Sequence, residues 1–175
     1  MKKITSLAGR ELKWIQPGAW RPHFELRVGG EIAATLHFES SFSGFAVAES
    51  EDGCWTFKRS GFFRKRVAIV DRNSGKEIAS YREGNWGRGG TLSMPGGKSL
   101  HGTSDFWMRN FRFNGESPEP LLEFKNSGVF HHSAIVHMSP SAADMPELPW
   151  MVMLAWYLIM VMKRDSEAVA AAAAG

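Results

Sequence analysis

One short stretch of the chain combines positive charge with aromatic rings. Cations attract anionic lipid headgroups, and aromatic side chains enter the layer between headgroups and acyl chains. The stretch therefore predicts peripheral contact with an anionic membrane surface. A second interpretation packs its Phe side chains into the end of the folded core and leaves its basic side chains solvated. Its members are Lys58, Arg59, Phe62, Phe63, Arg64, Lys65 and Arg66.

Three further residues have the types found in a hydrolytic triad, namely His101, Ser104 and Asp105. These types recur in many sequences, and no GxSxG motif accompanies them here. Ser104 and Asp105 more simply cap a turn before Phe106. The sequence therefore predicts no catalytic residues and a non-enzymatic protein.

Gly96-Gly97-Lys98-Ser99 resembles the end of a phosphate-binding P-loop. The full motif also requires a glycine at the position that Leu92 occupies. We expect a hairpin turn at Pro95-Gly96-Gly97 instead, and we predict neither a cofactor nor a metal site.

The residues from Leu12 to Met138 have the pattern of short antiparallel strands separated by turns. In the clearest hairpin, apolar and polar residues alternate over 23–28 and 31–39 around Gly29-Gly30, a pair suited to a type I′ turn. The pattern predicts about twelve strands, more than an open twisted sheet comfortably holds. Closure into a barrel, or division into two packed sheets, would remove or shorten the exposed edges.

After the last strand, Trp150 to Met162 is an unbroken apolar run, and Pro149 suits a first helical turn. A helix over 149–162 spans about 21 Å, whereas a bilayer core is about 30 Å thick. A helix that is apolar on every face must nevertheless be surrounded. We expect it inside the barrel, and the alternative is a C-terminal membrane anchor.

Strands in consecutive hairpins followed by one apolar C-terminal helix resemble the tubby-like and phospholipid-scramblase-like (LURP-one-related) barrels. The segment from Gly61 to Ala79 is similar to the recurring hairpin of that superfamily, with an aromatic pair, basic residues, an apolar strand and an Asp…Gly turn. The resemblance implies a mainly β fold, a closed antiparallel barrel of about twelve strands around a central apolar helix at about 149–163. It also suggests a lipid- or membrane-associated role. This chain lacks the Cys-rich and Pro-rich regions of scramblases.

The length of 175 residues suits one domain. We expect that domain over 1–165, followed by a flexible Ala-rich tail over 166–175. One cysteine, Cys54, and an N-terminus without an apolar signal segment favour the cytoplasm, at or away from a membrane surface. The formal net charge of +3 permits anionic lipids as partners. A protein partner, in a scaffold role without lipid binding, is the alternative, and we expect no nucleic-acid partner.

Overall fold

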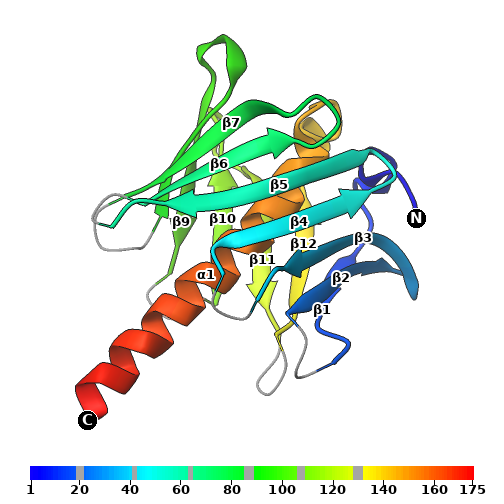
Figure 1. The fold of residues 1–175 in the computed structure, drawn as a ribbon. Helices are drawn as coiled ribbons and strands as arrows, with labels where there is room; N and C mark the ends of the chain where they lie inside the picture. Colours follow the sequence, from blue (N-terminus) through cyan, green and yellow to red (C-terminus); the bar gives the residue numbers. More distant parts are fainter. Residues whose placement is uncertain (19–21, 41–42, 63–64, 85–88, 106–108, 128–131) are drawn as a thin grey trace.

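In the computed structural model, twelve antiparallel strands close into a barrel around one long helix (Figure 1). The structure describes residues 1–18, 22–40, 43–62, 65–84, 89–105, 109–127 and 132–175. The strands are β1 (Leu12–Ile15), β2 (His23–Val28), β3 (Glu31–Phe38), β4 (Phe45–Ser50), β5 (Gly53–Ser60), β6 (Arg66–Asp71), β7 (Lys76–Glu83), β8 (Gly89–Ser93), β9 (Ser99–Ser104), β10 (Asn110–Asn114), β11 (Pro120–Asn126) and β12 (Ala134–Met138). The other described elements are the 3-10 helices η1 (Ile4–Leu7), η3 (Pro95–Gly97) and η4 (Pro140–Ala142), and the helix α1 (Leu148–Ala174).

Each strand pairs with its neighbours in the sequence, and β1 pairs with β12 to close the barrel. Leu12 lies opposite Val136 and Trp14 opposite Ala134 in this last pair. Closure leaves no strand with unpaired backbone groups at an edge. The predicted barrel is thereby confirmed.

The alternation of residues along the strands decides which side chains fill the barrel. Phe24, Leu26 and Val28 on β2 are buried, while the residues between them are partly exposed. Gly29 and Gly30 join β2 to β3 with φ of 53° and 88°, as a type I′ turn requires. The predicted hairpin at 95–97 is also confirmed, because η3 forms the turn between β8 and β9.

The helix α1 begins at Leu148, with Pro149 in its first turn, and every residue from Leu148 to Met162 is buried. Its aromatic side chains stack on rings from the barrel wall. The Trp156 ring lies parallel to that of Trp14 with centroids 5.6 Å apart. Tyr157 stacks on Phe38 at 5.4 Å. The barrel thus encloses the apolar run, as predicted.

The helix is longer than the predicted 149–163, because it continues to Ala174. Alanine has the highest helix propensity. The buried part of α1 is already helical, so the Ala-rich segment can extend the helix without the free-energy cost of nucleating a new one. Residues from Ser166 onward are exposed. The flexibility of this Ala-rich segment stays a prediction. None of the helices in the described ranges is long and apolar enough to span a bilayer.

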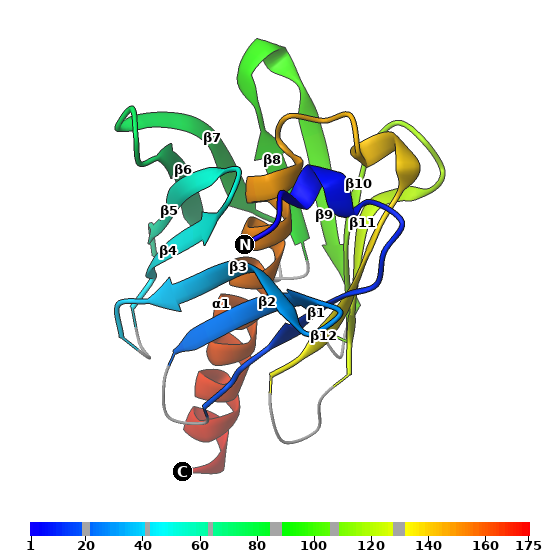
Figure 2. The ribbon, with the colours of Figure 1, turned by 90° about the vertical axis from the view of Figure 1, so that its right-hand side faces the viewer.

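We call the end of the barrel from which α1 protrudes the mouth, and the opposite end the base (Figures 1 and 2). The base is covered by η1, in which Ile4 and Leu7 are buried. The Ile4 backbone N–H donates to the Asp52 carboxylate at 2.7 Å. Strand β5 ends at the mouth and β6 starts there, so the fold places the described residues of the basic and aromatic stretch at the mouth.

Replacing Leu158 by alanine tests the buried part of the helix. Leu158 is fully buried, so Leu158→Ala should lower the free energy of unfolding by about 2–5 kcal/mol. Val169 lies on the same helix with 71% of its surface exposed, and Val169→Ala should change stability by less than about 0.5 kcal/mol. Urea unfolding followed by tryptophan fluorescence measures both. Equal effects would contradict the enclosed helix.

Candidate functional site

The predicted basic and aromatic stretch is divided between two faces of the barrel wall. Arg59 lies on the same inward face of β5 as the buried Phe57, while Lys58 points outward and is exposed. Arg66 precedes the inward-facing Val67 and lies on the outer wall. The stretch therefore supplies side chains both to the inside of the mouth and to its outer surface.

Phe62 is 84% exposed at the turn between β5 and β6. The interpretation that packs this ring into the barrel end is therefore wrong. Phe63 and Arg64 lie outside the described residues.

Inside the mouth, four charged side chains meet, and we call them the mouth cluster: Arg59, Lys65, Glu83 and Asp165. The Asp165 carboxylate accepts hydrogen bonds from Arg59 Nη1 at 3.2 Å and from Arg59 Nη2 at 2.6 Å. Lys65 Nζ donates to the Oδ2 atom of the same carboxylate. On its other side, Arg59 Nη2 lies 2.7 Å from Glu83 Oε1. Two cations and two anions thus form a neutral network between α1 and strands β5 to β7.

The members of the mouth cluster differ in burial, and their pKa values differ accordingly. The Glu83 side chain is only 8% exposed, and burial raises the pKa of its carboxyl although Arg59 acts in the opposite direction. Asp165 is 40% exposed. Burial raises its pKa too, but the hydrogen bonds from Arg59 and Lys65 outweigh burial and leave the pKa lowered. Burial lowers the pKa of Arg59, but its two carboxylate partners raise it overall.

Other polar contacts attach α1 to the neighbouring β3–β4 side of the mouth, where the Arg59 backbone N–H donates to the Gly44 carbonyl at 3.0 Å. The Tyr157 hydroxyl donates to the Gly44 carbonyl at 2.5 Å. Arg164 Nη1 donates to the Ser43 carbonyl at 3.1 Å, and its guanidinium carbon lies 3.9 Å from the centroid of the Phe38 ring. Both the β3–β4 and the β5–β7 sides of the barrel therefore hold the helix where it leaves the interior.

Some polar atoms on the inner side of the mouth have no hydrogen-bond partner among the described residues: Tyr81 Oη, Arg59 Nε and Glu83 Oε1. Glu83 Oε1 lies 2.7 Å from Arg59 Nη2 in an ion pair, but the two groups do not have the geometry of a hydrogen bond. The Tyr81 ring lies beneath two glycines, since a Cβ on Gly90 would come within 2.7 Å of its hydroxyl and one on Gly102 within 2.9 Å. These glycines leave the room that the phenol occupies.

On the outer wall of the mouth, the cations are less engaged. Arg66 forms an ion pair with Glu77, and both side chains are about one-third to one-half exposed. Within the described ranges, Lys58 has no acidic partner. Exposed ion pairs contribute about 0–1 kcal/mol, so Arg66 can exchange Glu77 for another anion at little cost.

Of the three residues with the types of a hydrolytic triad, Asp105 is held by hydrogen bonds to residues close in the chain. Asp105 accepts hydrogen bonds from the Arg109 backbone N–H at 2.6 Å and from the Asn110 side chain at 3.0 Å. Asp105 thus binds the residues that lead into β10, and its capping of a turn before Phe106 stays a prediction. A group of three or more potential metal ligands is not found within the described ranges.

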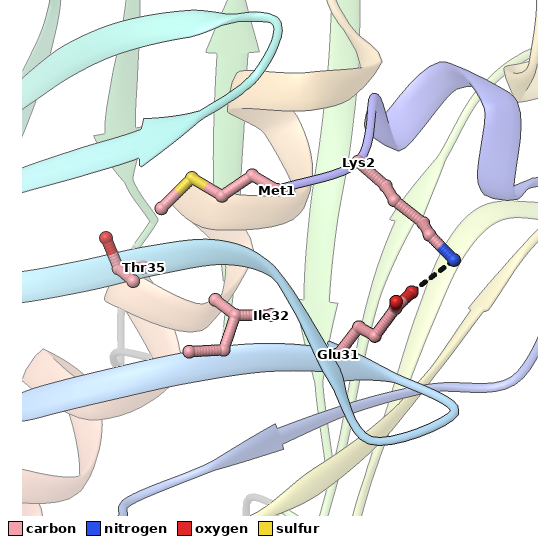
Figure 3. Close-up of a pocket in the computed structure, with 5 residues that line it drawn as sticks. All are labelled: Met1, Lys2, Glu31, Ile32 and Thr35. Atoms are coloured by element: carbon pink, nitrogen blue, oxygen red, sulfur yellow. Dashed lines mark ion pairs between the residues drawn. The ribbon is translucent and has the colours of Figure 1, made fainter.

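A pocket of about 480 Å³ lies at the base, where Met1 and Lys2 face β3 (Figure 3). Its other lining residues are Glu31, Ile32 and Thr35. Lys2 forms an ion pair with Glu31, and this contact lowers the Glu31 pKa. The two charged side chains that line the pocket are therefore paired with each other. The pocket contains none of the residues predicted from the sequence.

Sequence reasoning missed Glu83 and Asp165, although a signal for each was present. Arg59 follows Phe57 by two residues and Glu83 follows Tyr81 by two, so both share a strand face with buried aromatics. Asp165 follows the last buried helical residue, Met162, by three positions, which places the two on one helix face.

A scan against protein-family models and searches of curated proteins and of solved structures give no match for this chain. The fold agrees with the architecture that the tubby-like and scramblase-like resemblance implies. Membership of that superfamily stays a prediction.

The two tyrosines of the mouth provide a matched pair of substitutions. Tyr157→Phe removes a hydrogen bond and should cost about 0.5–1.5 kcal/mol of unfolding free energy. Tyr81→Phe removes a buried hydroxyl without a described partner and should leave stability unchanged or raise it by about 1 kcal/mol. Thermal and urea unfolding measure both. A clear loss of stability in Tyr81→Phe would show that this hydroxyl has a bonding partner.

Asp165→Asn tests the mouth cluster through pH. Because the pKa of Asp165 is lowered in the folded state, its ionised form stabilises the fold above the ordinary carboxyl range. That contribution is lost as pH falls through the lowered value. At pH 7 the variant should be less stable by about 1 kcal/mol, a modest figure because solvent screens this partly exposed group.

The difference in unfolding free energy between wild type and Asp165→Asn should shrink as pH falls below about 4. Urea unfolding at pH 7 and near pH 3 measures it. A difference that is independent of pH would show that the charge of Asp165 does not stabilise the helix.

Proposed function

We propose that the protein is a non-enzymatic barrel module that binds anionic lipid headgroups peripherally through the outer wall of its mouth. The observation that carries the proposal is the exposure of Phe62, at 84%, in a turn between strands that bear outward-facing Lys58 and Arg66. An exposed ring beside cations is the combination that peripheral membrane proteins insert at the lipid interface. The proposal places the protein in the cytoplasm, at a membrane surface.

The energies of these contacts support a reversible association. Burial of one Phe side chain contributes about 1.5–3 kcal/mol. Each Lys or Arg near an anionic leaflet adds about 1 kcal/mol. Arg59 and Lys65 add little in this state because Asp165 and Glu83 already neutralise them. The proposed binding therefore depends on Phe62, Lys58 and Arg66, with Arg64 nearby in the sequence.

A second candidate function is a protein-interaction module without lipid affinity. It is favoured by the exposed extension of α1 from Ser166 to Ala174, which projects from the mouth into solvent (Figure 1). Val169 on this extension is 71% exposed. A projecting helix with an apolar side chain can enter the groove of a partner.

Vesicle co-sedimentation tests the lipid proposal. We expect the wild type to bind vesicles of phosphatidylcholine with phosphatidylserine, and to bind less as salt rises, since ions screen the attraction. Phe62→Ala should weaken binding by about tenfold, the equivalent of 1.4 kcal/mol. The double variant Lys58→Glu with Arg66→Glu should reduce it further.

The matched control is the double variant Lys76→Glu with Lys98→Glu, which changes two exposed lysines away from the mouth. Each Lys→Glu or Arg→Glu substitution changes the formal charge by −2, so both double variants go from +3 to −1. Equal loss of binding in the two would indicate an effect of net charge alone. Wild-type protein that ignores anionic vesicles at low salt would exclude lipid binding and favour the protein-interaction candidate.

A further inference from the structure

Arg59 and Lys65 together bind the carboxylate of Asp165. The two Nη atoms of Arg59 donate to the two oxygens of Asp165, at 3.2 and 2.6 Å, and Lys65 donates to one of them. This paired contact of a guanidinium with an oxyanion is also the geometry in which arginine binds phosphate. The position of Asp165 therefore marks where an external oxyanion would sit.

The burial of the cluster decides from which side a ligand can approach. Glu83 is 8% exposed and contacts Arg59 from the inner side. The side chains of Asp165 and Lys65 are 40% and 33% exposed. An anion from solvent thus meets Asp165 first, and it reaches Arg59 only when the Asp165 side chain turns away.

We infer that Asp165 acts as an internal ligand that blocks a phosphomonoester site made of Arg59 and Lys65. The inference deepens the proposed function and rests on it, because it adds a second, gated anion site beside the outer wall of the mouth. In the closed state the four charges of the mouth cluster cancel. With Asp165 displaced, the two cations and Glu83 leave a net charge of +1 to attract the ligand.

The charge of the ligand follows from competition with Asp165. An intramolecular carboxylate acts at an effective concentration in the millimolar range or above, so a free monoanion of equal strength displaces it only at higher concentrations. A phosphomonoester carries a charge of about −1.5 to −2 at neutral pH and has three acceptor oxygens. It can occupy the Arg59 fork and Lys65 together and so replace both contacts that Asp165 makes.

Asp165→Asn should open the site, and Glu167→Gln is the matched control. Both substitutions remove one negative charge from α1, but Glu167 is exposed and absent from the mouth cluster. Isothermal titration with glycerol 3-phosphate should show binding to Asp165→Asn that is about fivefold or more tighter than to Glu167→Gln, the equivalent of about 1 kcal/mol. Lys65→Ala added to Asp165→Asn should abolish the gain.

Two vesicle arms separate a lipid headgroup from a free phosphate. Vesicles with phosphatidic acid present a phosphomonoester, whereas phosphatidylserine presents a phosphodiester and a carboxylate. If the occupant is a headgroup, Asp165→Asn should gain on phosphatidic acid vesicles but not on phosphatidylserine vesicles of equal charge. A gain on glycerol 3-phosphate alone would identify a soluble phosphomonoester as the ligand.

The outcomes distinguish this inference from the proposed function. If the wild type binds phosphatidylserine vesicles while Asp165→Asn and Glu167→Gln behave alike on every phosphate probe, the internal-ligand role is wrong and the proposed function stands. If the wild type binds no vesicle but Asp165→Asn binds glycerol 3-phosphate, the proposed lipid binding is wrong and the internal-ligand role of Asp165 stands.

A measurement on the wild type covers the case in which Asp165→Asn does not fold. At pH 7, where glycerol 3-phosphate is mostly the dianion, the carbon-13 shift of the Asp165 carboxyl should change in 100 mM glycerol 3-phosphate but not in chloride of equal ionic strength, because displacement removes its two cationic partners. An unchanged shift would overturn the inference.

Discussion

Burial of the apolar part of α1 inside the barrel is the interaction on which the rest of this structure depends. From Leu148 to Met162 no face of the helix is polar, so water is excluded as a neighbour on every side. Large apolar side chains gain about 1.5–3 kcal/mol each on full burial, and this gain is available only if the wall closes completely around them. A small barrel of about eight strands is filled by its own side chains, whereas twelve leave space for a helix. Closure also pairs every strand with two neighbours. The same geometry therefore buries the apolar helix and removes the exposed edges of the sheet.

The mouth cluster follows from the point at which that burial ends. Between Met162 and Ser166 the helix passes from an apolar interior into solvent, and its first acidic residue there is Asp165. Charges that are partly buried need partners, because an unpaired charge in this environment is costly. Arg59 and Lys65 from the wall meet this requirement, and Glu83 balances them from the inner side. The contacts that hold the helix therefore also occupy the cations best placed to bind an anion, which links the stability of the mouth to its proposed function.

Sequence patterns predicted much of this architecture because the relevant signals are local. Alternation on β2 and β3 around Gly29-Gly30 specifies a hairpin and its inward face without reference to the rest of the chain. The apolar run after Pro149 likewise predicted a surrounded helix, although its end was placed too early. The Ala-rich end of the chain predicts a flexible tail, because low-complexity chain ends are poorly ordered unless the fold holds them. Attachment to an already folded helix removes the cost of nucleation, and that advantage depends on the barrel.

For the candidate site, the sequence by itself determined which residue types gather between positions 58 and 66 and that strands on both sides bring them to one end of the fold. Only the tertiary structure decided their roles. The two-residue period of a strand sends Lys58 outward and Arg59 inward, and the partner of Arg59 on α1 is 106 positions away in the chain. Pairing across such a distance depends on where the closed barrel places the end of its helix. The same stretch therefore supplies an exposed aromatic and basic surface outside the mouth and a neutralised charge network within it.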